Sequence, residues 1–251
     1  KELIKKILEL RLEKAQLFGY DNFAAYQLDD KMAKTPQAAY DMLMQIWKPA
    51  IAKAQEERDD LQKMMNESGI EGQLEAWDWW YYAEKLRKKR FALDEAQLKP
   101  YFSLENVRKG AFLVANRLFG VSFQPLKLAG ATDAQTESSP NVPDVYHPEV
   151  SCFEVQDSTG KHLALYYTDY FPRSTKRAGA WMNNIVEAIH LDSMDQDPMI
   201  VNVCNFTPAT ATTPSLLNLD ETRTLFHEFG HATHGYLTQC HYPTVSGTSV
   251  A

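Results

Sequence analysis

The sequence predicts a mainly α-helical protein with one small β-sheet. Three observations support this fold class. Apolar residues recur every three or four positions through much of the first half, which is typical of helices that bury one face. A β-hairpin pattern and a third strand-like run follow, at 150–168 and 199–206. A last helical pattern, at 218–237, comes after the strands.

The first helices have recognisable ends. One begins almost at residue 1 and stops near Gly19, and its apolar face contains Leu3, Ile4, Ile7 and Leu8. Thr35 and Pro36 form a capping and first-turn pair for a long helix. We expect Pro49 to kink or interrupt this helix before Gly69.

Two more helices are expected at 77–92 and 103–119. The first has an aromatic start and a basic end. Aromatic residues at helical spacing mostly fill cores, and cations in a last turn complement the helix dipole, so this pattern does not indicate nucleic-acid binding. In the second helix, Ser103 is a good N-cap and Gly120 stands in the position of a C-terminal cap.

The strand signals lie in the second half. Residues 150–156 alternate in polarity, 157–160 form a turn signal, and 161–168 are again apolar and aromatic. The run at 199–206 can join the same sheet. The polar stretch 131–139 is the best internal boundary. It divides a helical region, residues 1–130, from a region of residues 131–251 that holds the sheet and the last helix.

Composition and charge exclude several classes of protein. With 251 residues and 44% hydrophobic content, the chain can bury a sizeable core. No run approaches the roughly eighteen apolar residues that a membrane-spanning helix needs, and the first residues lack the apolar region of a secretory signal. The net charge of −7 argues against nucleic acid or an anionic membrane as a main partner. The sequence does not indicate the oligomeric state.

The cysteines indicate the redox environment of the protein rather than a metal-binding or catalytic site. Cys152, Cys204 and Cys240 are an odd number in scattered positions, without a C-x-x-C pair or a disulfide framework. We interpret each as a small, partly buried apolar residue. A reducing compartment fits this usage, and we expect the cytoplasm.

The last helical pattern contains His227-Glu228-Phe229-Gly230-His231. Asn218 and Glu221 have the spacing of a capping box, so the motif is expected inside a helix. Side chains four residues apart lie one turn apart, which lets both histidines bind one metal ion. Zinc is the natural occupant of such a pair. Glu228 is turned about a hundred degrees from His227 and is expected to act as general base on a water.

Other nearby side chains are weaker candidates. His234 follows His231 by three residues, but a helix surface curves away too fast for three such residues to converge easily on one ion. A supporting or packing role fits it better. Asp220 lies on the same face as His227 and can hydrogen-bond a ligand, although helix initiation is the simpler role. A different reading remains open, in which the motif faces solvent on a non-catalytic helical binding module.

Several ordered segments carry a resemblance to a known family. They are 30–36, 176–182, 202–206, 224–235, which includes the motif, and 242–248. Together they spread across nearly the whole chain, and the set resembles the thimet-oligopeptidase (M3) family of zinc metallopeptidases. Within that family it is most similar to the bacterial peptidyl-dipeptidases.

The resemblance implies a helical zincin-type peptidase, with a deep channel and a small β-sheet beside the HExxH helix. By position it makes His227 and His231 the Zn²⁺ ligands and Glu228 the catalytic carboxylate. It implies that short peptides are the substrates and that C-terminal dipeptides are released. An endo-acting oligopeptidase of the same family remains an alternative. The strand expected along the substrate cleft contains Asn202, Val203, Cys204, Asn205 and Phe206.

The same resemblance implies an incomplete site. In this family a third ligand, a glutamate, lies roughly 25 residues past the second histidine, about five residues beyond Ala251. A helix that begins almost at residue 1, without a methionine, also suggests a fragment of a longer catalytic domain. We therefore expect the 251 residues alone to bind zinc weakly and not to hydrolyse peptides.

Overall fold

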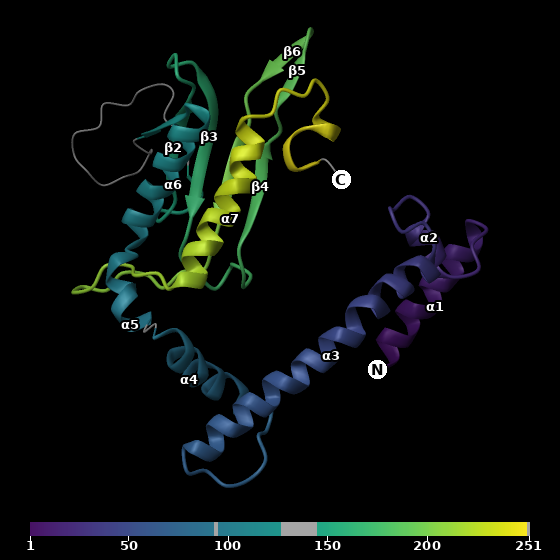
Figure 1. The fold of residues 1–251 in the computed structure, drawn as a ribbon. Helices are drawn as coiled ribbons and strands as arrows, with labels where there is room; N and C mark the ends of the chain where they lie inside the picture. The colour runs from purple at the N-terminus through teal and green to yellow at the C-terminus, as the bar shows by residue number, and fades with distance from the viewer. Residues whose placement is uncertain (93–94, 127–144, 250–251) are drawn as a thin grey trace. The chain divides into compact units, whose positions relative to one another are not determined.

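The computed structural model describes residues 1–92, 95–126 and 145–249 (Figure 1). The chain divides into two compact units, one before and one after the boundary 93/94. The regular elements described in the first unit are helices: α1 (Glu2–Leu17), α2 (Phe23–Leu28), α3 (Pro36–Glu67) and α4 (Trp79–Phe91). The second unit contains a mixed sheet with helices. The prediction of a mainly helical chain with a small sheet is therefore confirmed.

The long helix α3 begins as the sequence predicts. The Thr35 hydroxyl accepts a hydrogen bond from the Ala38 amide at 3.1 Å, and Pro36 occupies the first turn. The helix continues through Pro49 to Glu67, so Pro49 does not interrupt it. A proline removes one backbone hydrogen bond, but the residues around Pro49 are exposed, and water can satisfy the carbonyl left without a partner.

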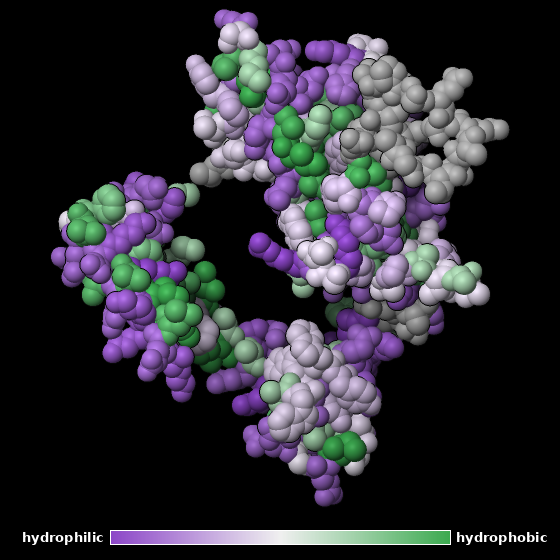
Figure 2. Space-filling view, turned by 180° about the vertical axis from the view of Figure 1, so that it is seen from behind, coloured by the Kyte–Doolittle hydropathy of each residue, from purple (hydrophilic) through white to green (hydrophobic). Residues whose placement is uncertain are grey.

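Apolar side chains lie at the surface of the first unit (Figure 2). Its own core is a small cluster between α3 and α4, formed by Leu61, Met64, Met65 and Tyr82. The residues predicted to form the apolar face of α1 are exposed; they are Leu3, Ile4, Ile7 and Leu8. The periodicity thus predicted the helix correctly, although no described element of this unit covers that face.

The second unit is built on a five-stranded sheet with the order β1-β2-β3-β7-β4. Its strands are β1 (Ser122–Pro125), β2 (Ser151–Gln156), β3 (His162–Asp169), β4 (Trp181–Val186) and β7 (Met199–Val203). Strand β7 runs parallel to β3, and the other neighbours are antiparallel. Two short strands, β5 (Ile189–Leu191) and β6 (Met194–Gln196), pair separately. The edge strands of the larger sheet are β1 and β4.

Helices α6 (Leu104–Phe119) and α7 (Leu219–Tyr236) cover one face of this sheet (Figure 1). Ala111 and Ala115 of α6 and Phe229 of α7 pack with strand residues such as Tyr166 and Ile200. Ser103 caps α6, and Gly120 ends it with a φ of 72°. A short helix, α5 (Glu95–Leu98), and three 3₁₀ turns, η1 (Lys99–Tyr101), η2 (Pro243–Val245) and η3 (Gly247–Ser249), complete the unit.

The domain boundary remains a prediction. The compact units divide at 93/94 rather than at 130/131, because α6 packs on the sheet. The polar stretch 131–139 lies outside the described residues. None of the helices in the described part of the chain combines the length and the apolar character that crossing a bilayer requires.

Candidate metal centre

Helix α7 begins with the capping box that the sequence predicts. The Asn218 side chain accepts from the Glu221 amide at 2.8 Å, and the Glu221 carboxylate accepts from the Asn218 amide at 2.8 Å. Both bonds satisfy backbone donors that a helix start leaves without partners. The cap starts the helix two turns before the histidines.

The apolar face of α7 determines where the motif points. Leu225, Phe229, Ala232 and Tyr236 are buried and pack in the core against the sheet. Their spacing follows the helical period, so residues between them turn away from that core. His227 and His231 are consequently exposed, while Glu228 lies at the margin of the buried face with 7% of its surface exposed.

The two histidines lie close to the separation that one zinc ion would require. Their Nε2 atoms lie 3.1 Å apart, and their rings are at 89° to each other. Nitrogens at zinc–nitrogen distances of about 2.0 to 2.1 Å, with a tetrahedral angle, are about 3.3 to 3.4 Å apart. The distance also suits an imidazole N–H···N hydrogen bond without metal. The pair of imidazoles is therefore compatible with one zinc ion after a side-chain movement of a few tenths of an ångström.

Glu228 lies beside both histidines. It lines two adjoining hollows, one with His227, Asp220 and Thr224, and the other with His231. Ala180 also contributes to both hollows. The carboxylate has no hydrogen-bond partner among the described residues, so its oxygens remain available to a water or a substrate.

The segment predicted to follow the substrate cleft, 202–206, begins in the interior strand β7 and continues beyond its end at Val203. β7 pairs with β3 on one side and β4 on the other, which occupies both edges of its backbone. Asn202, Val203, Cys204 and Phe206 are buried, and Asn205 is partly buried. Burial, with the nearby charge of Glu228, raises the pKa of the Cys204 thiol to about 12, so this thiol is neutral at physiological pH. Direct contact between these side chains and a substrate remains a prediction.

The element beside the motif is instead β4, which the sequence analysis did not identify as a strand. Ala180, Trp181 and Met182 line the hollow that holds Glu228 and His231. β4 pairs with β7 on one side only, so its other edge is unpaired within the sheet. The signal in the sequence is weak, because 181–186 has two asparagines among its apolar residues.

A third protein ligand is not found in the described part of the chain. No group of three His, Cys, Asp or Glu side chains there has an arrangement suited to a metal ion. His234 is exposed on the turn after His231. Asp220 shares a hollow with His227, but its side chain is 92% exposed and points toward Arg223 at 4.0 Å. Neither residue completes a three-ligand set.

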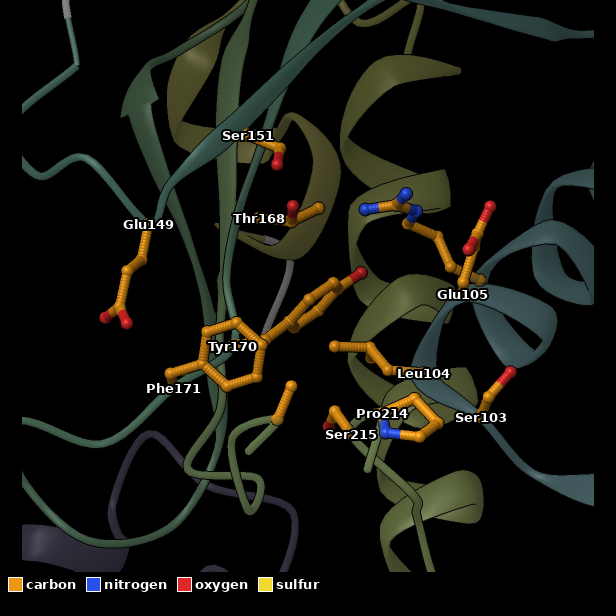
Figure 3. A pocket seen from close by; sticks show the side chains of 12 residues that line it. Ser103, Leu104, Glu105, Glu149, Ser151, Thr168, Tyr170, Phe171, Pro214 and Ser215 are labelled. Carbon is orange, nitrogen blue, oxygen red and sulfur yellow. The ribbon is translucent and has the colours of Figure 1, made fainter. Parts of the chain in front are cut away.

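A second cavity, of about 370 Å³, lies between the start of α6 and the ends of β2 and β3 (Figure 3). Ser151 and Thr168 are register partners on these strands, and their hydroxyl groups point into it (Figure 3). Its lining includes Arg108 and two glutamates but no histidine or cysteine among the described residues. It offers neither an activated nucleophile nor a soft metal ligand, so α7 is the stronger candidate for a metal-dependent site.

Two imidazoles one helical turn apart are a metal-binding pair typical of metal-dependent peptidases, and a glutamate directly after the first histidine is typical of the same motif. Comparison with known families agrees with this class. The chain matches the family model described as "Peptidase family M3" over residues 1–251. It therefore belongs to peptidase family M3, and the predicted family is confirmed.

The most similar relatives include bacterial peptidases of two names. The chain is 41% identical over 248 residues to the dipeptidyl carboxypeptidase of Salmonella typhimurium, covering 98% of this chain and 34% of the relative. It is 40% identical to the Escherichia coli protein of the same name, with the same coverage. Identity to Salmonella typhimurium oligopeptidase A is 36% over 249 residues, again 98% of this chain and 34% of the relative. The chain thus spans about a third of the length of these relatives.

Proposed function

We propose that this chain carries the catalytic helix of a zinc peptidase that releases C-terminal dipeptides from short peptides. The observation that carries the proposal is the 3.1 Å separation of the His227 and His231 Nε2 atoms beside the buried Glu228. The 41% identity to a dipeptidyl carboxypeptidase supports the substrate class.

In the proposed mechanism, His227 and His231 are the residues that would hold the metal ion. Zinc, when bound, supplies a Lewis acid for the scissile carbonyl and lowers the pKa of a water. Glu228 accepts a proton from the attacking water and then delivers it to the leaving amine. The neutral Cys204 thiol beneath the site takes no part as a nucleophile, so no acyl intermediate forms on it.

The unpaired edge of β4 provides a means of holding the peptide. An extended peptide can add to such an edge through backbone hydrogen bonds, which are independent of side-chain identity. The edge belongs to the strand whose first residues, Trp181 and Met182, lie beside Glu228. Residues 202–206 would then contribute to the cleft indirectly, by supporting β4 and the residues that precede it.

Substitution of the proposed base tests this mechanism. In a form of the protein with the full length of its relatives, Glu228→Gln should keep stoichiometric zinc but lower kcat by about 100-fold or more, because it removes the base and spares the ligands. Metal analysis and a dipeptide-release assay measure the two effects. Glu105→Gln, an exposed glutamate on α6, is the matched control and should retain wild-type turnover. Full turnover in the Glu228→Gln protein would show that Glu228 is not the base.

An endo-acting oligopeptidase is the second candidate, favoured by the 36% identity to oligopeptidase A. Product analysis on peptides with free and with amidated C-termini separates the two. Release of dipeptides only from the free form supports a dipeptidyl carboxypeptidase. Internal cleavage of both forms supports the oligopeptidase.

We also propose a cytoplasmic location. Cys152, Cys204 and Cys240 are all unpaired, and the first two are buried, which fits a reducing compartment. Cell fractionation of the native protein tests this location, and recovery in an oxidising compartment would contradict it.

A further inference from the structure

The turn that precedes β4 determines where β4 stands beside the catalytic helix. Residues 177–179 lead into Ala180, which lines both hollows with Glu228. Ala180 and Met182 also pack against the core that α7 shares with the sheet. A displacement of this turn would therefore move Ala180 and the start of β4, which line the hollows beside Glu228.

Asn205 holds this turn from the neighbouring strand. It follows β7, and its side-chain amide donates to the carbonyl of Arg177 and to the carbonyl of Gly179, each at 2.8 Å. An asparagine amide has two N–H donors, so both are used on one turn. Gly179 has a φ of 97°, a left-handed conformation that glycine adopts readily. The turn is thus fixed by a clamp on two carbonyls two residues apart.

Lys176 anchors the start of the same turn. Its side chain is 4% exposed, and its ammonium donates to the Asp169 carboxylate at 3.1 Å, to the Asp169 carbonyl at 3.0 Å and to the Phe171 carbonyl at 2.6 Å. It also donates to the carbonyl of Cys204. A buried ammonium is costly unless it is paired in this way, so the anchor holds one geometry. It joins the turn to the ends of β3 and β7.

We propose that Asn205 is a positioning residue for peptide hydrolysis, which fixes the 177–179 turn so that Ala180 and β4 stand in register beside Glu228. Asn205 acts through the turn and not by contact with the peptide, which differs from a direct substrate-binding role. The inference rests on the proposed peptidase activity. Small displacements of the residues that line a substrate site lower turnover strongly. The loss of the Asn205 side chain should therefore affect mainly kcat.

The test uses Asn205→Ala in the full-length form, with zinc content and unfolding midpoint measured beside peptide kinetics. We expect kcat to fall by about 10-fold or more, with KM changed by less than about threefold and zinc retained. Asn116→Ala is the matched control, because the Asn116 amide also donates to a backbone carbonyl, that of Val121 at 3.0 Å, at the far end of α6. It should lower stability without lowering kcat.

A second variant probes the turn from its backbone. Gly179→Ala introduces strain at φ 97° without a steric clash, since no atom lies within 4 Å of the added carbon. It should lower kcat like Asn205→Ala, and the double variant should lose less than the product of the two effects, because both act on one turn. It also keeps the test decisive if Asn205→Ala fails to fold.

The outcomes separate the inference from the proposed function. A wild-type protein that does not hydrolyse peptides contradicts the proposed function itself. An active wild type, with kcat unchanged in folded Asn205→Ala or in Gly179→Ala, overturns only the positioning role. Equal losses of kcat in Asn205→Ala and Asn116→Ala would also overturn it, by showing a general effect of stability.

Discussion

Gly235 is the residue at which α7 comes closest to the sheet. A Cβ atom at this position would lie 2.5 Å from Cδ1 of Ile200, a side chain of β7 that is completely buried. The backbone of η3 is close on another side, since a Cβ at Gly247 would lie 3.3 Å from the Gly235 Cα. Glycine inside a helix is usually unfavourable by about 1 kcal/mol, so close packing explains its presence here.

Gly235→Ala should destabilise the second unit by about 1 to 2 kcal/mol, because the overpacking against Ile200 exceeds the gain in helix propensity. Urea unfolding measures the change. Gly110→Ala in α6 is the control, since a Cβ there meets no atom within 4 Å and should stabilise by about 0.5 to 1 kcal/mol. Equal stabilisation by both substitutions would contradict the close approach.

At the scale of the elements, Asp169 joins the end of β3 to the segment before β4. Arg173 donates to both of its carboxylate oxygens at 2.7 Å, Lys176 donates to one at 3.1 Å, and the Tyr146 hydroxyl donates to the other at 2.9 Å. Burial alone would raise the pKa of Asp169, but the hydrogen bonds from Arg173 and Lys176 outweigh it and hold that pKa below its usual value. The ionised form is therefore part of the folded structure.

A lowered pKa in the folded state stabilises the protein above the unfolded value, about pH 4, and this contribution disappears as the pH falls through the folded value. Asp169→Asn should cost about 3 kcal/mol at pH 7, because it leaves the Lys176 ammonium buried without its carboxylate. The difference from wild type should shrink as the pH approaches 2. Unfolding free energies measured from pH 7 to pH 2 check this, and a constant difference would contradict it.

The elements themselves were predictable where local chemistry is strong. The cap at Thr35, the hairpin turn at Asp157 and the capping box at Asn218 each produced the expected element. Strand β4 was missed because its stability comes from pairing with β7, a partner that follows it by more than a dozen residues. The position of β7 between β3 and β4 could not be predicted either, because no local sequence pattern specifies the order of strands in a sheet.

At the scale of the whole molecule, the i, i+4 spacing predicts which helix carries the candidate ligands but not which strand lies beside them. The i, i+4 rule alone brings His227 and His231 together, and the structure has their Nε2 atoms 3.1 Å apart. Ala180 and Met182 come beside Glu228 only through sheet topology and the clamp of Asn205. A site that combines local and non-local parts is therefore only half predictable from sequence.

The metal affinity of the 251 residues follows from their ligand count. Catalytic zinc sites use three protein ligands, and no third ligand joins His227 and His231 in the described part of the chain. The 251-residue protein should therefore lose its zinc on dialysis and show no dipeptide release. The full-length form should keep about one zinc per chain and be active. Metal analysis after dialysis, beside the release assay on both forms, measures these differences. Tight zinc and robust turnover in the shorter form would mean that two histidines and Glu228 suffice, and would contradict the need for a third ligand.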